Sequence, residues 1–347
     1  MTSDLASFMA TMIARSRPLA VERAVALARD GYALEARAAR LSGERDENFR
    51  LTADDGAEYL LKIAHSAEER LVTELPIAAL RHVARSDPTL PCPRVIAARS
   101  GAGWIRFLDE EGSERIAYLL TFLPGRMVAA TARSQPQRTA CGRIAGQLSK
   151  ALRGFGHPAV RRPIIWDVRH TAGVARLLEP LASFPCREAA LELLNEMAPI
   201  VASQLPRLRQ QVVHNDLNTH NILVDPVDEA RVTGVIDFGD MVHTALAADV
   251  AVVAAEQIPE DHTVDLSAAG EMIHDVAAAY HERLPLLEPE LGVLGTLIAA
   301  RLVTNLVVQA WHLRHNPGGG HYRPLALDLV PARLQIARGL LREAIRL

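Results

Sequence analysis

Cysteine is scarce in this 347-residue chain, which holds three cysteines, Cys92, Cys141 and Cys186, far apart in sequence. No CxxC pair and no Cys/His spacing typical of a zinc site occurs, which excludes a cysteine-based metal site. An odd number of cysteines also argues against a disulfide framework. We therefore expect a reducing, cytoplasmic setting for the protein.

A large excess of one charge is also absent, since the formal net charge is −3 at pH 7. The chain lacks the basic footprint of a nucleic-acid-binding protein and the Lys/Arg-rich run that binds an anionic membrane surface. Residues 1–18 lack the long apolar core of a signal peptide, and no run of 18 apolar residues is free of charges. We expect no membrane span, and we find no internal repeat and no low-complexity segment.

The hydrophobic pattern of the first part of the chain predicts a small sheet. Apolar residues make up 49% of the chain and charged residues 23%, and the length indicates one two-lobed enzyme or two domains. Three short strands separated by turns fill residues 33–63 as an antiparallel meander. Residues 66–86 predict a helix with Ser66 as N-cap, and Pro76 marks a kink or the true start of that helix. With the strands before residue 123, this part predicts a five-stranded sheet and one helix.

The pattern changes at PGRM, residues 124–127. From about residue 133 to the end, helical periodicity dominates. Short strands interrupt it around 212, 222 and 232–236. The sequence therefore predicts an α+β fold of two lobes, a small antiparallel-sheet lobe over residues 1–123 and a larger, mostly helical lobe over residues 124–347.

The most polar feature is HNDLNTHN, residues 214–221, which directly follows an apolar strand. Another strand follows it, and a third leads into IDFGD, residues 236–240. Strands in this order bring Asp216, Asn221 and Asp237 to one edge. Phosphoryl transfer needs a carboxylate that accepts the proton of the attacking hydroxyl, and oxygen ligands that hold Mg²⁺ on the phosphates. A polar turn between two hairpin strands is the alternative interpretation of the same residues.

The pattern H-x-D-x-x-x-x-N followed by I-D-F-G-D resembles the catalytic and metal-binding motifs of the aminoglycoside phosphotransferase and choline kinase superfamily. The resemblance covers most of the chain and includes WDV at 166–168 and DVA at 249–251. Within the superfamily, the sequence is most similar to the hydroxylysine kinases and their bacterial relatives. The resemblance implies a protein-kinase-like fold, nucleotide binding by the first lobe, and phosphorylation of a small-molecule hydroxyl by the second.

The resemblance also implies roles for five residues of these motifs. Asp216 corresponds to the catalytic base, and Asn221 and Asp237 correspond to the ligands of Mg²⁺. His214 corresponds to a residue that braces the catalytic loop. Asp249 corresponds to a buried aspartate that hydrogen-bonds back to that loop.

Lys62 lies in the middle of an apolar strand, YLLKIA, where an ammonium group needs a partner. In kinase-like folds this lysine holds the α and β phosphates and pairs with a helix glutamate. We expect Glu74 to be that partner, with Glu68 and Glu69 as alternatives because Pro76 leaves the helix register open. A lysine that snorkels from an edge strand is the alternative for Lys62 itself.

The turn at residues 41–49 occupies the place of the loop that covers the nucleotide phosphates. It is not a glycine-rich loop of the protein-kinase type, because Gly43 is its only glycine. The related small-molecule kinases depart from the glycine-rich pattern too, so the resemblance makes Gly43 and Asn48 candidates for nucleotide binding. Both residues also suit an ordinary hairpin turn.

The segment LLTFLPG, residues 119–125, fits the hinge that offers backbone groups to the purine, with Thr121 and Leu123 as the contact positions. Backbone contacts leave the choice between ATP and GTP open. The implied cofactor is Mg²⁺. Because Mg²⁺ prefers oxygen ligands, we do not expect His220 or His243 to bind it.

An acceptor that carries an amine needs carboxylates near the catalytic base, and an aromatic ring that faces the cation would add to binding. The candidates are Trp166, Asp167, Asp240 and Glu256, and Asp240 is also a candidate for the metal site or for a plain turn. Arg169 or Arg314 is a candidate for binding a substrate carboxylate. The loop at residues 314–324 either closes over the acceptor or forms a surface linker.

Three functions are compatible with these residues. The first is a kinase for a hydroxyl of an amino alcohol or hydroxy amino acid, with 5-hydroxylysine as the leading acceptor. The second is an aminoglycoside-type antibiotic phosphotransferase, which needs a more acidic acceptor site than the partly acidic helical lobe offers. The third is a non-catalytic binding protein of kinase fold, which requires the loss of at least one key residue. Lys62, Asp216, Asn221 and Asp237 are all present. The oligomeric state stays open.

Overall fold

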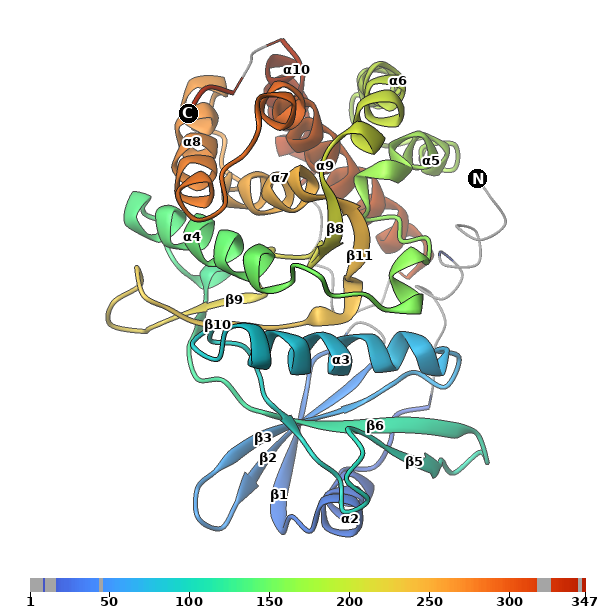
Figure 1. Ribbon diagram of the computed structural model, residues 1–347. Helices are drawn as coiled ribbons and strands as arrows, with labels where there is room; N and C mark the ends of the chain where they lie inside the picture. Colours follow the sequence, from blue (N-terminus) through green and yellow to red (C-terminus); the bar gives the residue numbers. More distant parts are fainter. Residues whose placement is uncertain (1–8, 10–16, 44–45, 317–325, 343–344) are drawn as a thin grey trace.

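The computed structural model describes residue 9 and residues 17–43, 46–316, 326–342 and 345–347. It has two lobes (Figure 1). The smaller lobe contains an antiparallel sheet, and the larger lobe is a group of packed helices with short strands between them. The expected two-lobed α+β fold is confirmed.

The sheet of the smaller lobe has six strands, in the order β1-β2-β3-β6-β4 with β5 paired to β6. The sequence predicts five strands. The shortest of the six is β4, which has two residues and pairs at the edge with β6. The elements are α2 (Val21–Tyr32), β1 (Ala36–Leu41), β2 (Glu47–Ala53), β3 (Glu58–Ile63), α3 (Arg70–Ser86), β4 (Val95–Ile96), β5 (Ile105–Leu108) and β6 (Glu114–Thr121).

The two faces of this sheet have different roles because side chains alternate along a strand. Phe49 on β2 pairs with Leu61 on β3, and both pack with Leu27 of α2 in one buried cluster. The neighbouring pair, Asn48 and Lys62, therefore points to the opposite face. That face is turned toward the larger lobe, where Lys62 finds its partner.

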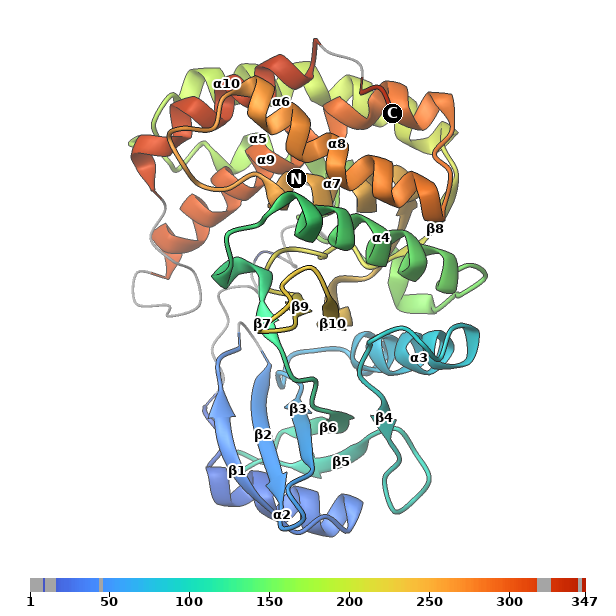
Figure 2. The same cartoon turned by 90° about the vertical axis from the view of Figure 1, so that its left-hand side faces the viewer.

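Helix α3 lies between the sheet and the larger lobe, as both views show (Figures 1 and 2). It packs against two 3-10 turns of the larger lobe, η2 (Pro158–Arg161) and η5 (Phe238–Asp240). The helix begins at Arg70, four residues later than predicted, and Ser66 is not its N-cap. Pro76 lies inside the helix, where it has no N–H to donate to the carbonyl four residues earlier.

The larger lobe is mostly helical and contains two small sheets with the orders β10-β9-β7 and β11-β8. The sequence predicts β8, β9 and β10 but not the other two, of which β7 has only two residues. The elements are β7 (Arg126–Met127), η1 (Val128–Ala130), α4 (Gln135–Ala151), η3 (Val168–His170), α5 (Thr171–Leu177), α6 (Arg187–Gln204), η4 (Leu205–Arg207), β8 (Gln210–Val213), β9 (Ile222–Val224), β10 (Val232–Val235), β11 (Val242–Ala245), α7 (Leu246–Gln257), α8 (Leu266–Arg283), α9 (Glu288–His315), η6 (Leu327–Leu329) and α10 (Val330–Leu340).

Helix α9 is the central helix of this lobe and packs against α5, α6, α7 and α10. Within the described part of the chain, it is the one helix long and apolar enough to cross a membrane by length and composition. Of its most apolar 18-residue window, 83% is buried inside the protein, which is typical of a core helix. Between Glu290 and Arg314, Arg301 is the only charged residue in this helix.

Candidate active site

The loop between β8 and β9 carries the predicted base, Asp216, and a buried histidine fixes that loop. The backbone N–H of Asp216 donates to Nδ1 of His214 at 3.3 Å, and Nε2 of the same ring lies 3.2 Å from the carbonyl of Ile236. Burial lowers the pKa of His214 to about 4, so the ring is neutral near pH 7. A neutral ring that accepts at Nδ1 must donate from Nε2. His214 thus ties the loop of the predicted base to the segment that leads into IDFGD.

Asp249, in the first turn of α7, holds the same loop from the other side. Its Oδ1 accepts the backbone N–H of Asn215 at 2.8 Å, and Ser149 donates to its Oδ2 at 3.5 Å. Asn215 has a left-handed backbone, with φ of 66°, which a residue other than glycine rarely adopts. The hydrogen bond to Asp249 stabilises this conformation directly before the base. Burial raises the pKa of Asp249 to about 6.

Asp216 and Asn221 are joined through the amide of Asn221. Its Nδ2 donates to the backbone carbonyl of Asp216 at 2.9 Å and to Oδ2 of the same residue at 2.6 Å. Both amide hydrogens are then used, which leaves Oδ1 of Asn221 as a ligand oxygen. Burial and the nearby Asp240 raise the pKa of Asp216, while Arg301 opposes that shift. A carboxylate with a raised pKa is a better proton acceptor.

Asp237 faces Lys62 across the two lobes. The Nζ of Lys62 donates to Oδ1 of Asp237 at 3.3 Å, and the Asp237 side chain is 48% exposed. The charge of Lys62 lowers the pKa of Asp237. Burial opposes the charged form of Lys62, but Asp237, Tyr118 and Asp46 together raise its pKa. Both groups are therefore ionised at neutral pH.

The two predicted metal ligands lie side by side, because the backbone N–H of Ile236 donates to the carbonyl of Asn221 at 2.9 Å. Asp237 has a left-handed backbone, with φ of 61°, at the point where its carboxylate leaves the strand. No cluster of three His, Cys, Asp or Glu residues able to hold a metal occurs in the described part of the chain. One amide oxygen and one carboxylate, completed by phosphate oxygens and water, suit Mg²⁺. These residues fit such an ion.

At the predicted nucleotide positions, Gly43 just after the end of β1 lies close to Asp46 just before the start of β2. A Cβ on Gly43 would lie 2.2 Å from the carbonyl oxygen of Asp46, so no other residue fits without a shift of the turn. Nδ2 of Asn48 donates to the carbonyl of Ser42 at 3.1 Å. Asn48 and Gly43 therefore set the shape of this turn, and Asn48 is the cross-strand neighbour of Lys62.

The hinge has a free backbone N–H at one of its two predicted positions. The N–H of Thr121 donates to the carbonyl of Arg94 at 2.9 Å, and the hydroxyl of Thr121 accepts from the N–H of Arg94 at 2.9 Å. The N–H of Phe122 donates to Glu58. In the described part of the chain, the N–H of Leu123 has no partner. Leu123 can therefore donate to a purine, whereas Thr121 can offer only its carbonyl.

The expected pair between Lys62 and Glu74 does not form. Glu74 lies 3.8 Å from Arg70, one turn earlier in α3, and Lys62 pairs with Asp237 instead. The sequence interpretation used a helix that starts at Ser66, but the helix starts at Arg70. Glu74 therefore lies in the first turns of α3, on the side near His157 of the larger lobe.

Two of the expected acceptor residues, Asp167 and Trp166, already have a cationic partner within the protein. The carboxylate of Asp167 is buried and accepts from Arg169, whose Nη2 lies 2.6 Å from Oδ2 of Asp167. This pair removes Asp167 as a ligand for an amine and Arg169 as a ligand for a carboxylate. Trp166 does face a cation, but the cation is Arg301, whose guanidinium lies 5.3 Å from the indole centroid.

Arg301 is the residue of this site that the sequence interpretation missed. Its side chain is 3% exposed, its Nη1 donates to the carbonyl of Trp166 at 3.0 Å, and its Nη2 lies 3.4 Å from Oδ1 of Asp216. A signal was present, because a single charge in an otherwise apolar helix needs a buried partner. Nothing local in the sequence says that the partner is Asp216, 85 residues earlier.

The structure also describes three further acceptor candidates, Glu256, Asp240 and Arg314. Glu256, at the end of α7, lies 3.9 Å from Nε of Arg301, and Asp240 is close enough to Asp216 to raise the pKa of that residue. Arg314 is exposed at the end of α9. The predicted loop at 314–324 lies mostly outside the described residues.

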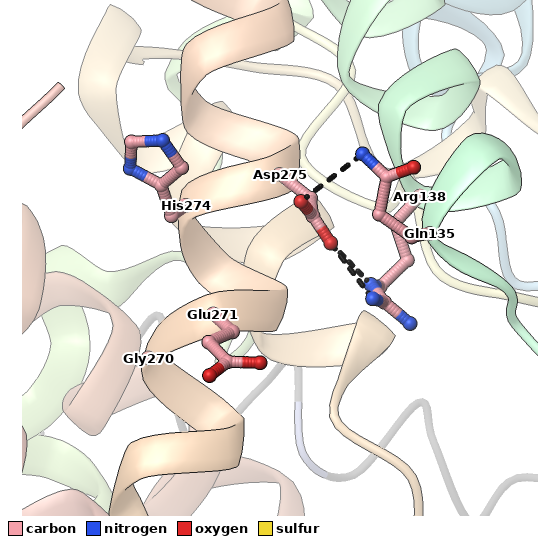
Figure 3. A pocket seen from close by; sticks show the side chains of 6 residues that line it. All are labelled: Gln135, Arg138, Gly270, Glu271, His274 and Asp275. Carbon is pink, nitrogen blue, oxygen red and sulfur yellow. Dashed lines mark hydrogen bonds and ion pairs between the residues drawn. The ribbon is translucent and has the colours of Figure 1, made fainter.

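A surface groove between α4 and α8 contains none of the predicted site residues (Figure 3). Its lining includes an ion pair in which Nη2 of Arg138 lies 2.7 Å from Oδ2 of Asp275. The exposed Glu271 also lines it. Because Asp275 is paired with Arg138, its carboxylate is not available to a ligand in this groove.

A comparison with known protein families assigns the chain to one of them. Residues 37–293 match the phosphotransferase enzyme family. The chain belongs to this family. It is 31% identical to the hydroxylysine kinase of Mus musculus over 304 residues, which are 81% of this chain and 79% of that protein. The hydroxylysine kinase of Bos taurus is 26% identical over 299 residues, which are 80% of this chain and 78% of that protein. This phosphotransferase therefore acts on a hydroxyl group.

Solved structures of kinases share the fold of this phosphotransferase. Amicoumacin kinase, solved in complex with AMP-PNP and Ca²⁺, superposes with a TM-score of 0.68 at 15% identity and covers 92% of this chain and 93% of its own. A microcompartment-associated aminopropanol kinase superposes with a TM-score of 0.65 at 18% identity and covers 94% of this chain and 99% of its own. The kinase-like fold is confirmed, and it implies a nucleotide donor and a divalent metal.

Proposed function

We propose that this phosphotransferase transfers the γ-phosphoryl group of ATP or GTP, with Mg²⁺, to the hydroxyl of a hydroxy amino acid or amino alcohol. The leading acceptor is 5-hydroxylysine. The similarity to hydroxylysine kinase over most of both chains carries this choice of acceptor. The presence of Lys62, Asp216, Asn221 and Asp237 in one connected site supports the chemistry. We propose that the reaction takes place in the cytoplasm.

Asp216 acts as the base in this proposal. The acceptor oxygen bonds to the γ-phosphorus while the bond from that phosphorus to the bridging oxygen breaks. The nucleoside diphosphate leaves, and the hydroxyl proton moves to Oδ1 or Oδ2 of Asp216. Asn218 and Asn221 donate to these two oxygens at 2.8 Å and 2.6 Å, which fixes the carboxylate for the transfer.

Lys62, Asn221 and Asp237 act on the phosphate side. The ammonium group of Lys62 contacts the α and β phosphates, and its contact with Asp237 is weakened as it does so. Oδ1 of Asn221 and the exposed carboxylate of Asp237 would hold Mg²⁺, which offsets negative charge on the phosphates when bound. The N–H of Leu123 and the carbonyl of Thr121 would contact the purine, and backbone groups of this kind suit adenine and guanine alike.

An antibiotic phosphotransferase is the competing acceptor class, since aminoglycosides carry several ammonium groups. A polycation needs an excess of carboxylates around the base. Here a buried guanidinium, Arg301, lies 3.4 Å from Asp216 and takes up part of that negative charge. This arrangement favours an acceptor with one amine near its reacting hydroxyl.

The test is nucleotide turnover with Mg²⁺ against 5-hydroxylysine, homoserine, choline, ethanolamine and kanamycin, each with ATP and with GTP. We expect turnover that depends on 5-hydroxylysine and that is lost in the Asp216→Ala variant. Turnover with kanamycin alone would assign the antibiotic class. Turnover with homoserine or choline alone would remove 5-hydroxylysine as the acceptor.

A further inference from the structure

Arg301 is an unusual group for the core of a helical lobe, because its guanidinium is buried but incompletely bonded. Its side chain is 3% exposed, and Nε has no hydrogen-bond partner in the described part of the chain. Nη1 donates to the carbonyl of Trp166 at 3.0 Å. Buried polar groups are usually satisfied, so an unpartnered one beside a catalytic residue needs a functional explanation.

Two carboxylates flank this guanidinium. Oδ1 of Asp216 lies 3.4 Å from Nη2, and Oε1 of Glu256 lies 3.9 Å from Nε. Charge-assisted hydrogen bonds between such groups are about 2.7–2.9 Å long, so neither carboxylate is fully engaged. Because the nitrogens belong to one rigid planar group, these two distances place the carboxylates no more than roughly 10 Å apart across Arg301.

Glu256 is held in place but keeps one oxygen available. Nδ2 of Asn305 donates to Oε1 of Glu256 at 2.7 Å, and Nη1 of Arg133 donates to the backbone carbonyl of Glu256 at 3.3 Å. Oε2 of Glu256 receives no hydrogen bond from the residues described, and the side chain is 19% exposed. A fixed carboxylate with an unbonded oxygen, on a partly exposed side chain, is a ready acceptor for an ammonium group.

The charges of the side chains around Arg301 fit an acceptor that carries a single ammonium group. Asp216 and Glu256 carry two negative charges, and Arg301 between them carries one positive charge. Asp237 is matched separately by Lys62. Asp240 adds a negative charge near Asp216, and Arg133, Arg333 and Glu260 lie near Glu256. With these groups included, the four carboxylates exceed the three guanidinium groups by one negative charge, which one ammonium balances.

We infer that Glu256 binds the ammonium group of the acceptor and that Arg301, as a positioning residue, sets its distance from the base. The inference rests on the proposed function and narrows its substrate class. Two hydrogen bonds of about 2.8 Å, one to each carboxylate, bridge such a gap when the amine stands on the carbon next to the reacting hydroxyl. The acceptor is thus a vicinal amino alcohol. In 5-hydroxylysine the group recognised is the ε-amine.

The experiment compares steady-state kinetics of the wild type, Glu256→Gln and Glu271→Gln. Glu271, the exposed glutamate in the groove of Figure 3, provides a matched change of charge away from the site. The acceptors are 5-hydroxylysine, 1-amino-2-propanol, and 5-hydroxylysine acetylated at the ε-amine or at the α-amine. Acetylation at the ε-amine removes the charge that Glu256 is inferred to bind.

We expect Glu256→Gln to raise KM for 5-hydroxylysine and 1-amino-2-propanol by about 10- to 100-fold, as for loss of a charged hydrogen bond, with the KM for nucleotide unchanged. The wild type should prefer 5-hydroxylysine to the ε-acetyl form, and Glu256→Gln should lose most of that preference. A merely structural role for Glu256 would lower activity on both forms and leave the preference intact, which would overturn the inference. Glu271→Gln should match the wild type.

Arg301→Lys tests the positioning role separately. It keeps one positive charge but removes the planar group that contacts both carboxylates. We expect kcat for 5-hydroxylysine to fall by more than KM rises, with the ε-acetyl preference retained. An unchanged kcat would remove Arg301 from the inference. If the wild type turns over none of the acceptors, the proposed function itself fails, which differs from turnover without an ε-amine preference.

Discussion

Asp249 offers a quantitative prediction, because burial acts against the charge of a carboxylate that hydrogen-bonds to the backbone of Asn215. Burial raises the pKa of its carboxyl from 3.8 to about 6. A shift of about two units corresponds to about 3 kcal/mol of unfolding free energy. Because the folded-state pKa is the higher one, the unfolded state loses its proton first as pH rises. The destabilisation is therefore absent below about pH 4, grows between pH 4 and 6, and is complete above pH 6.

The variant Asp249→Asn removes the charge and keeps an oxygen that can accept the N–H of Asn215, now at 2.8 Å from Oδ1. Between pH 5 and pH 8 the charge of Asp249 costs the wild type about 1–2 kcal/mol of additional unfolding free energy. The stability of the variant relative to the wild type should therefore rise by that amount over the same range. Urea unfolding followed by circular dichroism at the two pH values measures this difference. Effects of all other titrating groups cancel in the comparison.

Asp54→Asn is the matched control, since Asp54 lies in the exposed turn between β2 and β3. Its stability should stay within about 0.5 kcal/mol of the wild type at both pH values. An equal stability difference between Asp249→Asn and the wild type at pH 5 and at pH 8 would refute a pKa of Asp249 raised by burial.

Three further predictions concern catalysis and nucleotide binding. Asp216→Asn should lower acceptor-dependent turnover by about 10²–10⁴-fold, with Mg²⁺-nucleotide affinity by calorimetry unchanged; a similar loss of affinity would argue against a role as base. Asp237→Ala removes one of two metal ligands, so half-maximal turnover should require a much higher Mg²⁺ concentration, and an unshifted Mg²⁺ titration would contradict that assignment. Gly43→Ala places a methyl 2.2 Å from the carbonyl of Asp46 and should raise KM for the nucleotide, whereas Gly270→Ala, with no atom within 4 Å, should not.

Local sequence signals were sufficient to place the polar loop at residues 214–221. The polar run at 214–221 stands between apolar strands, and short strands around one loop have few possible arrangements. The structure accordingly brings Asn221 to Asp216 and places Asp237 beside Asn221. In each case the residue type, the spacing and the strand pattern point the same way.

Interactions between distant elements were harder to predict. The partner of Lys62 depends on where α3 begins, and a proline inside the helix made the sequence compatible with several starts. Asp167 looked available for an acceptor, but Arg169 two residues later takes its carboxylate. Arg301 contacts residues 85 and 135 positions away, and only the packing of α9 determines those contacts.

Transfer of the phosphoryl group to an alcohol oxygen, with Asp216 as the base, is the step on which the proposed function depends. Phosphorus NMR and mass spectrometry of the products from 5-hydroxylysine, Mg²⁺ and ATP or GTP observe that step itself. We predict one phosphomonoester at the 5-hydroxyl for each nucleotide consumed, and its loss in Asp216→Asn. Nucleotide consumption that yields only inorganic phosphate, or equal product from the variant, would contradict this mechanism.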